Sequence, residues 1–386
     1  MQSVYMDHSA TTPVDPEVLD AMIPYYTDIY GNTSSVHSQG QKAAKALEQA
    51  REQVAALIGA EPAEIIFTAG GTEADNQAII GFMNHEKQKK GKHIITSAIE
   101  HHAVLHTCEY LAKKGFELTV LPVNSLGLVE PDTLRAALRP DTALVSIMHA
   151  NNEIGTIQDI KTLAKITHEA GAVFHTDAVQ SFGKIPLNVK ELGVDLLSAS
   201  SHKLYGPKGI GCLYVKKGVR IGRYLHGGGH ERNLRAGTVN VPGAVGFGKA
   251  AELARQRMPQ NITYLKELGQ RLTKGILDTI PNSHLTGHPE KRLPGCVSVV
   301  FDYVEGESIL LMLDSYGIMA SSGSACTSGS LDSSHVLLAI GLPPEKAHGS
   351  LRLTLGKDNT EEEVDYVLEK LPPIIANLRR VSPLAK

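Results

Sequence analysis

The chain has 386 residues, 42% of them hydrophobic, and a formal net charge of −3. This length allows two or three domains with a large buried core. The small charge and the scattered basic residues argue against nucleic acid or an anionic membrane as a partner. Because no apolar stretch approaches the roughly 20 residues of a membrane span and the N-terminus lacks a secretory-signal pattern, we expect a cytoplasmic protein.

Short apolar segments alternate with helical ones in the first two thirds of the chain. We expect strands at Ile65–Thr68, Ile94–Ser97, Ala143–Met148, Val173–Thr176 and Asp195–Ala199, and helices at Gln41–Ile58, after Gly70-Gly71-Thr72, from about His102 and at Asp159–Ala170. This alternation predicts an α/β fold whose mostly parallel sheet has helices on both faces. Functional residues of such sheets gather beyond the carboxyl ends of the strands.

The pattern changes after about residue 250 and predicts a smaller α+β domain. The expected elements are a helix at Thr263–Thr279, a strand at Val297–Phe301, a helix at Ser308–Leu313, a strand at Leu351–Leu355 and a last helix opened by the capping box Thr360-x-x-Glu363. Residues 13–254 would form the large domain. Residues 1–12 and 255–386 would form the small one.

The four cysteines, Cys108, Cys212, Cys296 and Cys326, lie far apart and form no CxxC pair. This spacing argues against a disulfide framework or a zinc cluster and favours a reducing compartment. Cys326 lies in a run of small polar residues, whereas a buried structural cysteine normally has apolar neighbours. We therefore expect an exposed, reactive thiol at Cys326, with a plain loop as the alternative, and structural roles for the other three.

Lys203 follows the expected strand Asp195–Ala199 and precedes a glycine-rich turn. A lysine at such a position can form an imine with an aldehyde cofactor, although a solvated surface lysine is the commoner case. Asp177 ends the preceding strand, where a carboxylate can pair with a protonated pyridine nitrogen. A helix N-cap is the simpler interpretation of Asp177.

Two further motifs follow expected strands. Gly71 and Thr72 open a helix, where backbone N–H groups favour a phosphate, although an ordinary turn with a threonine cap is equally consistent with them. His101 could stack on a cofactor ring, contribute to a zinc site or serve as a capping or core histidine, but too few zinc partners lie nearby. Arg352 interrupts an alternating strand; its side chain would either bind a substrate carboxylate or face solvent.

Together these motifs resemble the cysteine desulfurases of the NifS/IscS type, within class V of the fold-type I pyridoxal-phosphate enzymes. The resemblance extends from Asp7 to the last helix. It includes the runs Asp7-His8-Ser9-Ala10-Thr11-Thr12-Pro13, Gly31-Asn32-Thr33-Ser34-Ser35-Val36-His37, Asn151-Asn152-Glu153-Ile154-Gly155, His226-Gly227-Gly228-Gly229-His230-Glu231, Arg235-Ala236-Gly237-Thr238 and Ser322-Gly323-Ser324-Ala325-Cys326. It implies a mostly parallel seven-stranded sheet in the large domain.

The resemblance also implies residue roles. Lys203 would hold pyridoxal 5'-phosphate and later move protons, His101 would stack on the ring, and Cys326 would receive sulfur from L-cysteine as a persulfide, leaving L-alanine. The other implied cofactor contacts are Gly71, Thr72, Asn152, Asp177, Gln180, Ser200 and His202, and the implied substrate contacts are Asn32, Asn152 and Arg352. Thr238 would reach the neighbouring subunit's site in a homodimer. No resident metal is expected, although Cys326 could contact a cluster transiently.

The expected activity supplies sulfur for iron–sulfur cluster assembly, through a scaffold protein, or for thiolation of tRNA and cofactors. A class V aminotransferase, a selenocysteine lyase and a non-enzymatic sulfur-relay partner are the alternatives. Ser201 and Thr33 depart from the glycine and proline usual in the family. The chain ends soon after its last helix, at Lys386, so docking of a scaffold through a longer tail is not expected.

Overall fold

The computed structural model describes residues 3–88, 90–323 and 333–382. Within them, a seven-stranded sheet has the order β2-β8-β7-β6-β5-β3-β4. Its strands are β2 (Ile65–Thr68), β3 (His93–Ser97), β4 (Glu117–Leu121), β5 (Thr142–Ser146), β6 (Val173–Asp177), β7 (Leu196–Ser200) and β8 (Gly211–Val215). Only β8 runs against its two neighbours, so the expected mostly parallel sheet is confirmed.

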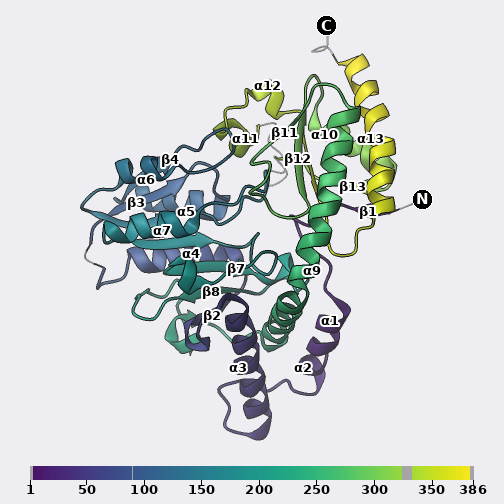
Figure 1. Ribbon diagram of the computed structural model, residues 1–386. Helices are drawn as coiled ribbons and strands as arrows, with labels where there is room; N and C mark the ends of the chain where they lie inside the picture. The colour runs from purple at the N-terminus through teal and green to yellow at the C-terminus, as the bar shows by residue number, and fades with distance from the viewer. Residues whose placement is uncertain (1–2, 89, 324–332, 383–386) are drawn as a thin grey trace.

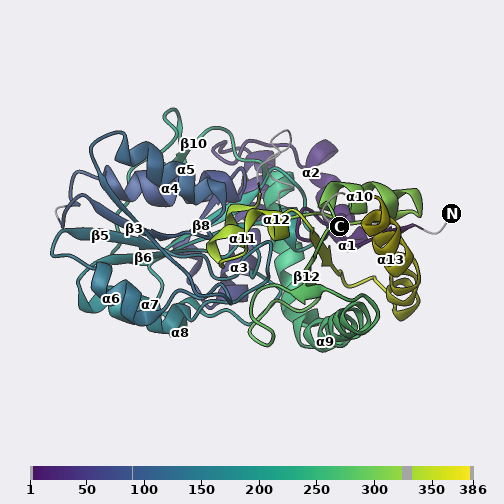
Figure 2. The ribbon, with the colours of Figure 1, turned by 90° about the horizontal axis from the view of Figure 1, so that it is seen from above.

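Helices cover both faces of this sheet, as the alternation predicts (Figures 1 and 2). One face carries α4 (Gly71–Met83) and α5 (His102–Ala112), and the other carries α3 (Ser38–Ile58), α6 (Pro131–Ala137), α7 (Ile160–Glu169), α8 (Val189–Leu192) and the first half of α9 (Val241–Thr279). Successive residues of a strand point to opposite faces. Ile94 accordingly packs under α4 and α5, and Ile95 packs on the opposite side.

A second core lies beyond the end of this sheet. The antiparallel strands β11 (Ser283–Leu285), β12 (Cys296–Phe301) and β14 (Ser350–Thr354) pack against the second half of α9, α10 (Gly306–Ser315) and α13 (Glu361–Val381). The N-terminal strand β1 (Val4–Tyr5) joins this core and pairs with β13 (Ile318–Met319). The capping box of Thr360 and Glu363 opens α13, as predicted.

The remaining elements are short. They are α1 (Pro16–Met22), α2 (Pro24–Thr27), α11 (His335–Ala339), α12 (Pro344–Ala347), the hairpin β9 (Gly229–His230) and β10 (Arg235–Ala236), and the 3-10 turns η1 (Pro62–Glu64), η2 (Ser201–Lys203) and η3 (Glu231–Asn233). Among the helices of the described residues, none has both the length and the apolar character that crossing a bilayer requires.

Helix α9 differs from its prediction, because it begins at Val241 and not near Thr263. Pro259 lies inside it, and a proline normally marks a helix start or break. Glycines in its first turns also hide the helical pattern: a Cβ on Gly248 would lie 2.5 Å from Gln53 Oε1, so α3 and α9 pack closely there. The helix contributes to both cores, and the expected domain boundary at residue 254 falls within it.

Candidate active site

A cavity of about 420 Å³ lies at the carboxyl ends of the parallel strands. It is lined by Asp7, Ser9, Ala10, Gly71, Thr72, Asp75, His101, Met148, Asn152, Asp177, Val179, Gln180, Ser200, His202, Lys203, Ser321 and Arg352. The carboxyl ends of neighbouring parallel strands meet at one edge of a sheet. This explains why residues that follow β3, β5, β6 and β7 meet in one place.

Lys203 ends the 3-10 turn that follows β7. Its Nζ donates hydrogen bonds to the backbone carbonyls of Ser9, at 2.5 Å, and Ala10, at 2.6 Å. The N-terminal segment is fixed beside it, because Thr12 donates from both its backbone N and its Oγ1 to the His202 carbonyl. The amine is thus held at the wall of the cavity, whereas the sequence alone also allowed a solvated lysine.

Asp177 ends β6 and is 5% exposed. Its Oδ1 accepts a hydrogen bond from the Val179 backbone N at 2.8 Å. It therefore caps a turn, and no helix of the described residues starts directly after it. Burial raises the pKa of Asp177 to about 6, opposed by the Val179 bond and the charge of Lys203. A cation inside the cavity would offset this burial and favour the carboxylate.

Asp75, on α4, is a second buried carboxyl at the same end of the cavity. Burial and the charge of Asp177 raise its pKa well above the ordinary value. Its Oδ1 has no hydrogen-bond partner. Asp75 follows Thr72 by three positions in the sequence, but no role at the site was predicted for it.

Gly71 and Thr72 begin α4, so its first backbone N–H groups face the cavity region. Gly71 is required by close packing, since a Cβ there would lie 2.6 Å from Val179 Cγ2. Ser200 and His202 line the same hollow, and it continues into a second one lined also by Lys208. A helix N-terminus surrounded by hydroxyl, imidazole and ammonium groups is a site for an anion.

His101 is the N-cap of α5, and its Nδ1 accepts a hydrogen bond from the Ala103 backbone N at 3.1 Å. The pKa of His101 is lowered to about 4, mainly by burial and further by the charges of His102 and Lys203. The ring is therefore neutral near pH 7, and the Ala103 bond assigns its proton to Nε2. His101 therefore both caps α5 and lines the cavity. The described residues include no group of three or more His, Cys, Asp or Glu side chains that could hold a metal.

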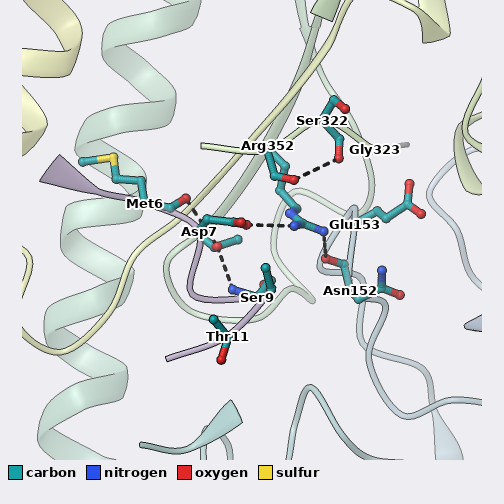
Figure 3. Close-up of polar contacts among 12 residues, drawn as sticks. Met6, Asp7, Ser9, Thr11, Asn152, Glu153, Ser322, Gly323 and Arg352 are labelled. Atoms are coloured by element: carbon teal, nitrogen blue, oxygen red, sulfur yellow. Dashed lines mark hydrogen bonds and ion pairs between the residues drawn. The ribbon is translucent and has the colours of Figure 1, made fainter. Parts of the chain in front are cut away.

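Arg352, on β14, is 3% exposed and reaches the cavity from the second core (Figure 3). Its guanidinium donates to Asp7 Oδ1 at 2.9 Å and to the Asn152 carbonyl at 3.1 Å. Its Nε is buried without a hydrogen-bond partner. The alternative of an outward-facing strand residue is wrong for Arg352, because tertiary pairing with Asp7 turns the side chain inward.

Gln180 lines the cavity and is fixed at both ends of its amide. Its Nε2 donates to the Ser9 carbonyl at 2.9 Å, and its Oε1 accepts from Lys184 Nζ at 3.3 Å. Burial lowers the pKa of Lys184 to about 7, and the charge of Lys203 adds to this effect. Lys184 was not singled out from the sequence. Its spacing of four residues from Gln180, one turn of helix-like backbone, was the available signal.

Other expected site residues do not line this cavity. Asn32 and Thr238 are exposed and absent from its wall. Cys326 lies outside the described residues. Ser201, a departure from the family pattern, turns away from the cavity and packs against Gly206.

The remaining cysteines, Cys108, Cys212 and Cys296, are buried and form no disulfide. Burial raises the pKa of the Cys108 and Cys212 thiols. Thiols held in this way are poor nucleophiles, in agreement with the structural roles expected for them.

Known proteins share this sequence pattern and this architecture. The class-V aminotransferase family model matches residues 4–367. The cysteine desulfurase IscS of Methanosarcina thermophila is 56% identical over 385 residues, which cover 99% of this chain and 94% of the relative. A solved NifS-like protein superposes with a TM-score of 0.92 at 41% identity and covers 98% of this chain and 100% of its own. The structure described as SspA in complex with cysteine has a TM-score of 0.82 at 37% identity, over 92% of this chain and 99% of its own.

Fold and cavity together define a fold-type I, pyridoxal-phosphate-dependent enzyme. Within that class, the chain belongs to the class-V aminotransferase family and to its cysteine desulfurases of the NifS/IscS type.

The residues of the cavity fit pyridoxal 5'-phosphate. Lys203 offers an amine for the aldehyde, the start of α4 offers an anion site for the phosphate, and Asp177 offers a buried carboxylate for the ring nitrogen. Asp75 lies at the same end of the cavity, and burial and the charge of Asp177 favour its neutral form.

Proposed function

We propose that this chain is an L-cysteine desulfurase in which Lys203 holds the cofactor and Cys326 receives the sulfur. The observation that carries the proposal is the meeting of Lys203, Asp177, Thr72 and Arg352 around one cavity of about 420 Å³. The cysteine desulfurases at 50–56% identity support the activity, and a solved relative named as a cysteine complex supports the substrate.

Each wall of the cavity has its own role in this proposal. Pyridoxal phosphate, when bound, serves as an electron sink for charge that develops on the amino acid. Asp177 would hold the ring nitrogen protonated, His101 would stack on the ring, and Gln180 would contact the ring hydroxyl. Gly71, Thr72, Ser200 and His202 would hold the phosphate. Asn152 would be a further contact of the cofactor.

Arg352 binds the carboxylate of L-cysteine, because its planar guanidinium matches a carboxylate in two parallel hydrogen bonds. Asp7 and the Asn152 carbonyl hold the guanidinium in place. Lys203 would also take the proton from the substrate α-carbon. Asn32, which is exposed in the described chain, would also contact the substrate carboxylate.

The sulfur step uses Cys326 as a nucleophile. Its thiolate attacks the sulfur of the substrate, forming a sulfur–sulfur bond while the carbon–sulfur bond breaks. The electron pair of the broken bond stays with the carbon skeleton, which takes up a proton and leaves as L-alanine. Cys326 retains the sulfur as a persulfide.

Assembly and sulfur delivery complete the proposal. Thr238, exposed on the described surface, reaches the phosphate site of a second copy, so the working form is a homodimer. The persulfide passes to an iron–sulfur scaffold protein or to a tRNA- or cofactor-thiolation acceptor. A cytoplasmic location stays a prediction from the sequence.

The decisive experiment is the variant Cys326→Ser, with Cys108→Ala as a buried-cysteine control. Purified Cys326→Ser should keep the visible absorption of lysine-bound cofactor and its change on addition of cysteine, but form neither persulfide nor sulfide. The control should keep all three. A Cys326→Ser protein that still releases sulfide from cysteine would overturn the mechanism. Transamination that survives in it would favour an aminotransferase, and faster turnover of selenocysteine by the wild-type protein would favour a selenocysteine lyase.

A further inference from the structure

Glu153 is a buried carboxyl that the mechanism above does not use. It belongs to the turn from Asn151 to Gly155 and is 4% exposed. Asn151 Oδ1 accepts the backbone N–H groups of Glu153 and Ile154, at 2.8 and 2.9 Å. The Asn151 amide in turn donates to the Ile99 carbonyl. The backbone that carries Glu153 is therefore fixed on the large sheet, and the direction of its side chain is fixed with it.

The Glu153 carboxylate contacts two segments that are eleven positions apart in the chain. Ser334 Oγ donates to Glu153 Oε2 at 2.5 Å and accepts from the Leu337 backbone N at 3.2 Å, so the N-cap of α11 is tied to Glu153. On the other side, a Cβ on Gly323 would lie 2.9 Å from the same Oε2. The backbone of Gly323 thus lies directly against the carboxylate.

These contacts are joined to the substrate end of the cavity. The neighbour of Glu153, Asn152, accepts a hydrogen bond from Arg352 through its carbonyl (Figure 3). Ser321 pairs with Arg352 in both directions along the backbone, at 2.7 and 3.2 Å, and Gly323 N donates to Ser350 Oγ. One framework therefore holds both Arg352 and the residues that enter the Cys326 segment.

A buried carboxyl at this position is costly for the fold. Burial raises the pKa of Glu153 to about 7, opposed by the Ser334 hydrogen bond and the charge of Arg352. An apolar group would avoid this desolvation cost. The cost indicates that an acceptor oxygen at this position does something that packing alone does not require.

We propose that Glu153 is a positioning residue for sulfur transfer, which holds the described flanks of the Cys326 segment, Gly323 and Ser334, in register with Arg352. This inference rests on the proposed function, because Cys326 must be the sulfur acceptor. Glu153 touches neither substrate nor cofactor in this role. It acts through the two residues that it fixes.

The test compares Glu153→Ala, Glu153→Gln and Ser334→Ala in single-turnover persulfide formation on Cys326. Asn188→Ala, which removes the N-cap of α8 far from the site, is the matched control for Ser334→Ala. Loss of a hydrogen bond to a charged group corresponds to roughly a tenfold or greater fall in rate, expected for Glu153→Ala and Ser334→Ala. Glu153→Gln should stay within about threefold, because its amide oxygen can still accept from Ser334.

A spectroscopic readout separates positioning from a general structural defect. All variants should keep the visible band of lysine-bound cofactor, and the cysteine concentration that half-saturates its change should shift less than about twofold. The double variant Glu153→Ala/Ser334→Ala should be no slower than the slower single one, since both remove the same contact. Unchanged persulfide formation in Ser334→Ala would overturn the inference, even if Glu153→Ala fails to fold.

The inference and the proposed function fail in different ways. If Cys326→Ser still desulfurates cysteine, the proposed function is wrong and the inference falls with it. If Cys326→Ser is inactive while Ser334→Ala forms persulfide at the wild-type rate, only the role of Glu153 is wrong.

Discussion

The two ends of the candidate site are built in different ways. At the cofactor end, Thr72 and His101 follow strands of one sheet, and Asp177 and Ser200 end two others, so the order of the strands places them together. At the substrate end, Arg352 comes from a strand of the second sheet, and its partners come from the N-terminal segment and a loop of the first core. One end depends on local strand endings, and the other depends on how two cores meet.

This difference determines how each end should respond to substitution. A residue at the cofactor end is supported by its own strand, so a change there removes chemistry and leaves the frame intact. A residue at the substrate end is supported by long-range pairing, so a change there also loosens the meeting of the two cores. The predictions below separate these two kinds of loss.

The largest effect is expected for Lys203→Ala. Removing the amine that holds the cofactor and moves the proton should lower desulfurase turnover by about 10³-fold or more. The visible band of lysine-bound cofactor should disappear, as measured by absorption of the purified protein with added pyridoxal phosphate. Lys165→Ala, an exposed lysine on α7, is the control and should keep both. A Lys203→Ala protein with an unchanged band would refute the assignment.

Asp177→Asn should come next, with a loss of about 10²–10³-fold in turnover, because a neutral amide no longer holds the ring nitrogen protonated. Its matched control is Asp75→Asn at the same end of the cavity. Burial and the charge of Asp177 raise the pKa of Asp75 and so favour its neutral form, which an amide resembles, and this variant should cost less than about fivefold. Equal losses in steady-state kinetics of the two variants would contradict this division of roles.

Arg352→Lys tests the substrate end. A lysine keeps the charge but loses the two parallel hydrogen bonds, so kcat/KM for cysteine should fall by about 10²-fold while the visible band of the cofactor stays. Asp7→Asn, which leaves the guanidinium in place but removes its ion partner, should have a smaller effect of about tenfold. If both variants lost the cofactor band, the two ends would not be independent.

The sequence predicted most of the large sheet and the cofactor end for one reason. Short buried strands followed by polar residues are local signals, and Asp177, Thr72 and Lys203 each carry one. The edge strand β4, half exposed along its length, and the antiparallel β8 were not predicted as strands, because sheet order and direction depend on distant pairing.

The substrate end was less visible. By its own pattern Arg352 was only a charge in an apolar strand, and nothing in the sequence paired it with Asp7, since 345 positions separate the two residues. Lys184 and Glu153 were missed as buried ionisable groups because burial is a tertiary property. Asn32 and Thr238 lie outside the cavity of the single chain, so the contacts expected of them stay predictions, and that of Thr238 depends on a second copy.

The smallest effect concerns pH and His149, which lies behind the cofactor end and bonds to Ser181 Oγ at 2.9 Å. Burial lowers its pKa from 6.5 to about 4. As the pH falls from 6.5 toward 4, His149 becomes protonated in the unfolded chain but stays neutral in the folded chain. Its burial therefore lowers the free energy of unfolding in that pH window and has no such effect above it. His149→Gln should therefore lose less stability than the wild-type protein between pH 7 and pH 5.5, by about 1 kcal/mol in the free energy of unfolding. Urea unfolding at the two pH values measures the difference, and His284→Gln, at a half-exposed histidine, is the control. If stability falls with pH in His149→Gln as it does in the wild-type protein, His149 is charged inside the fold.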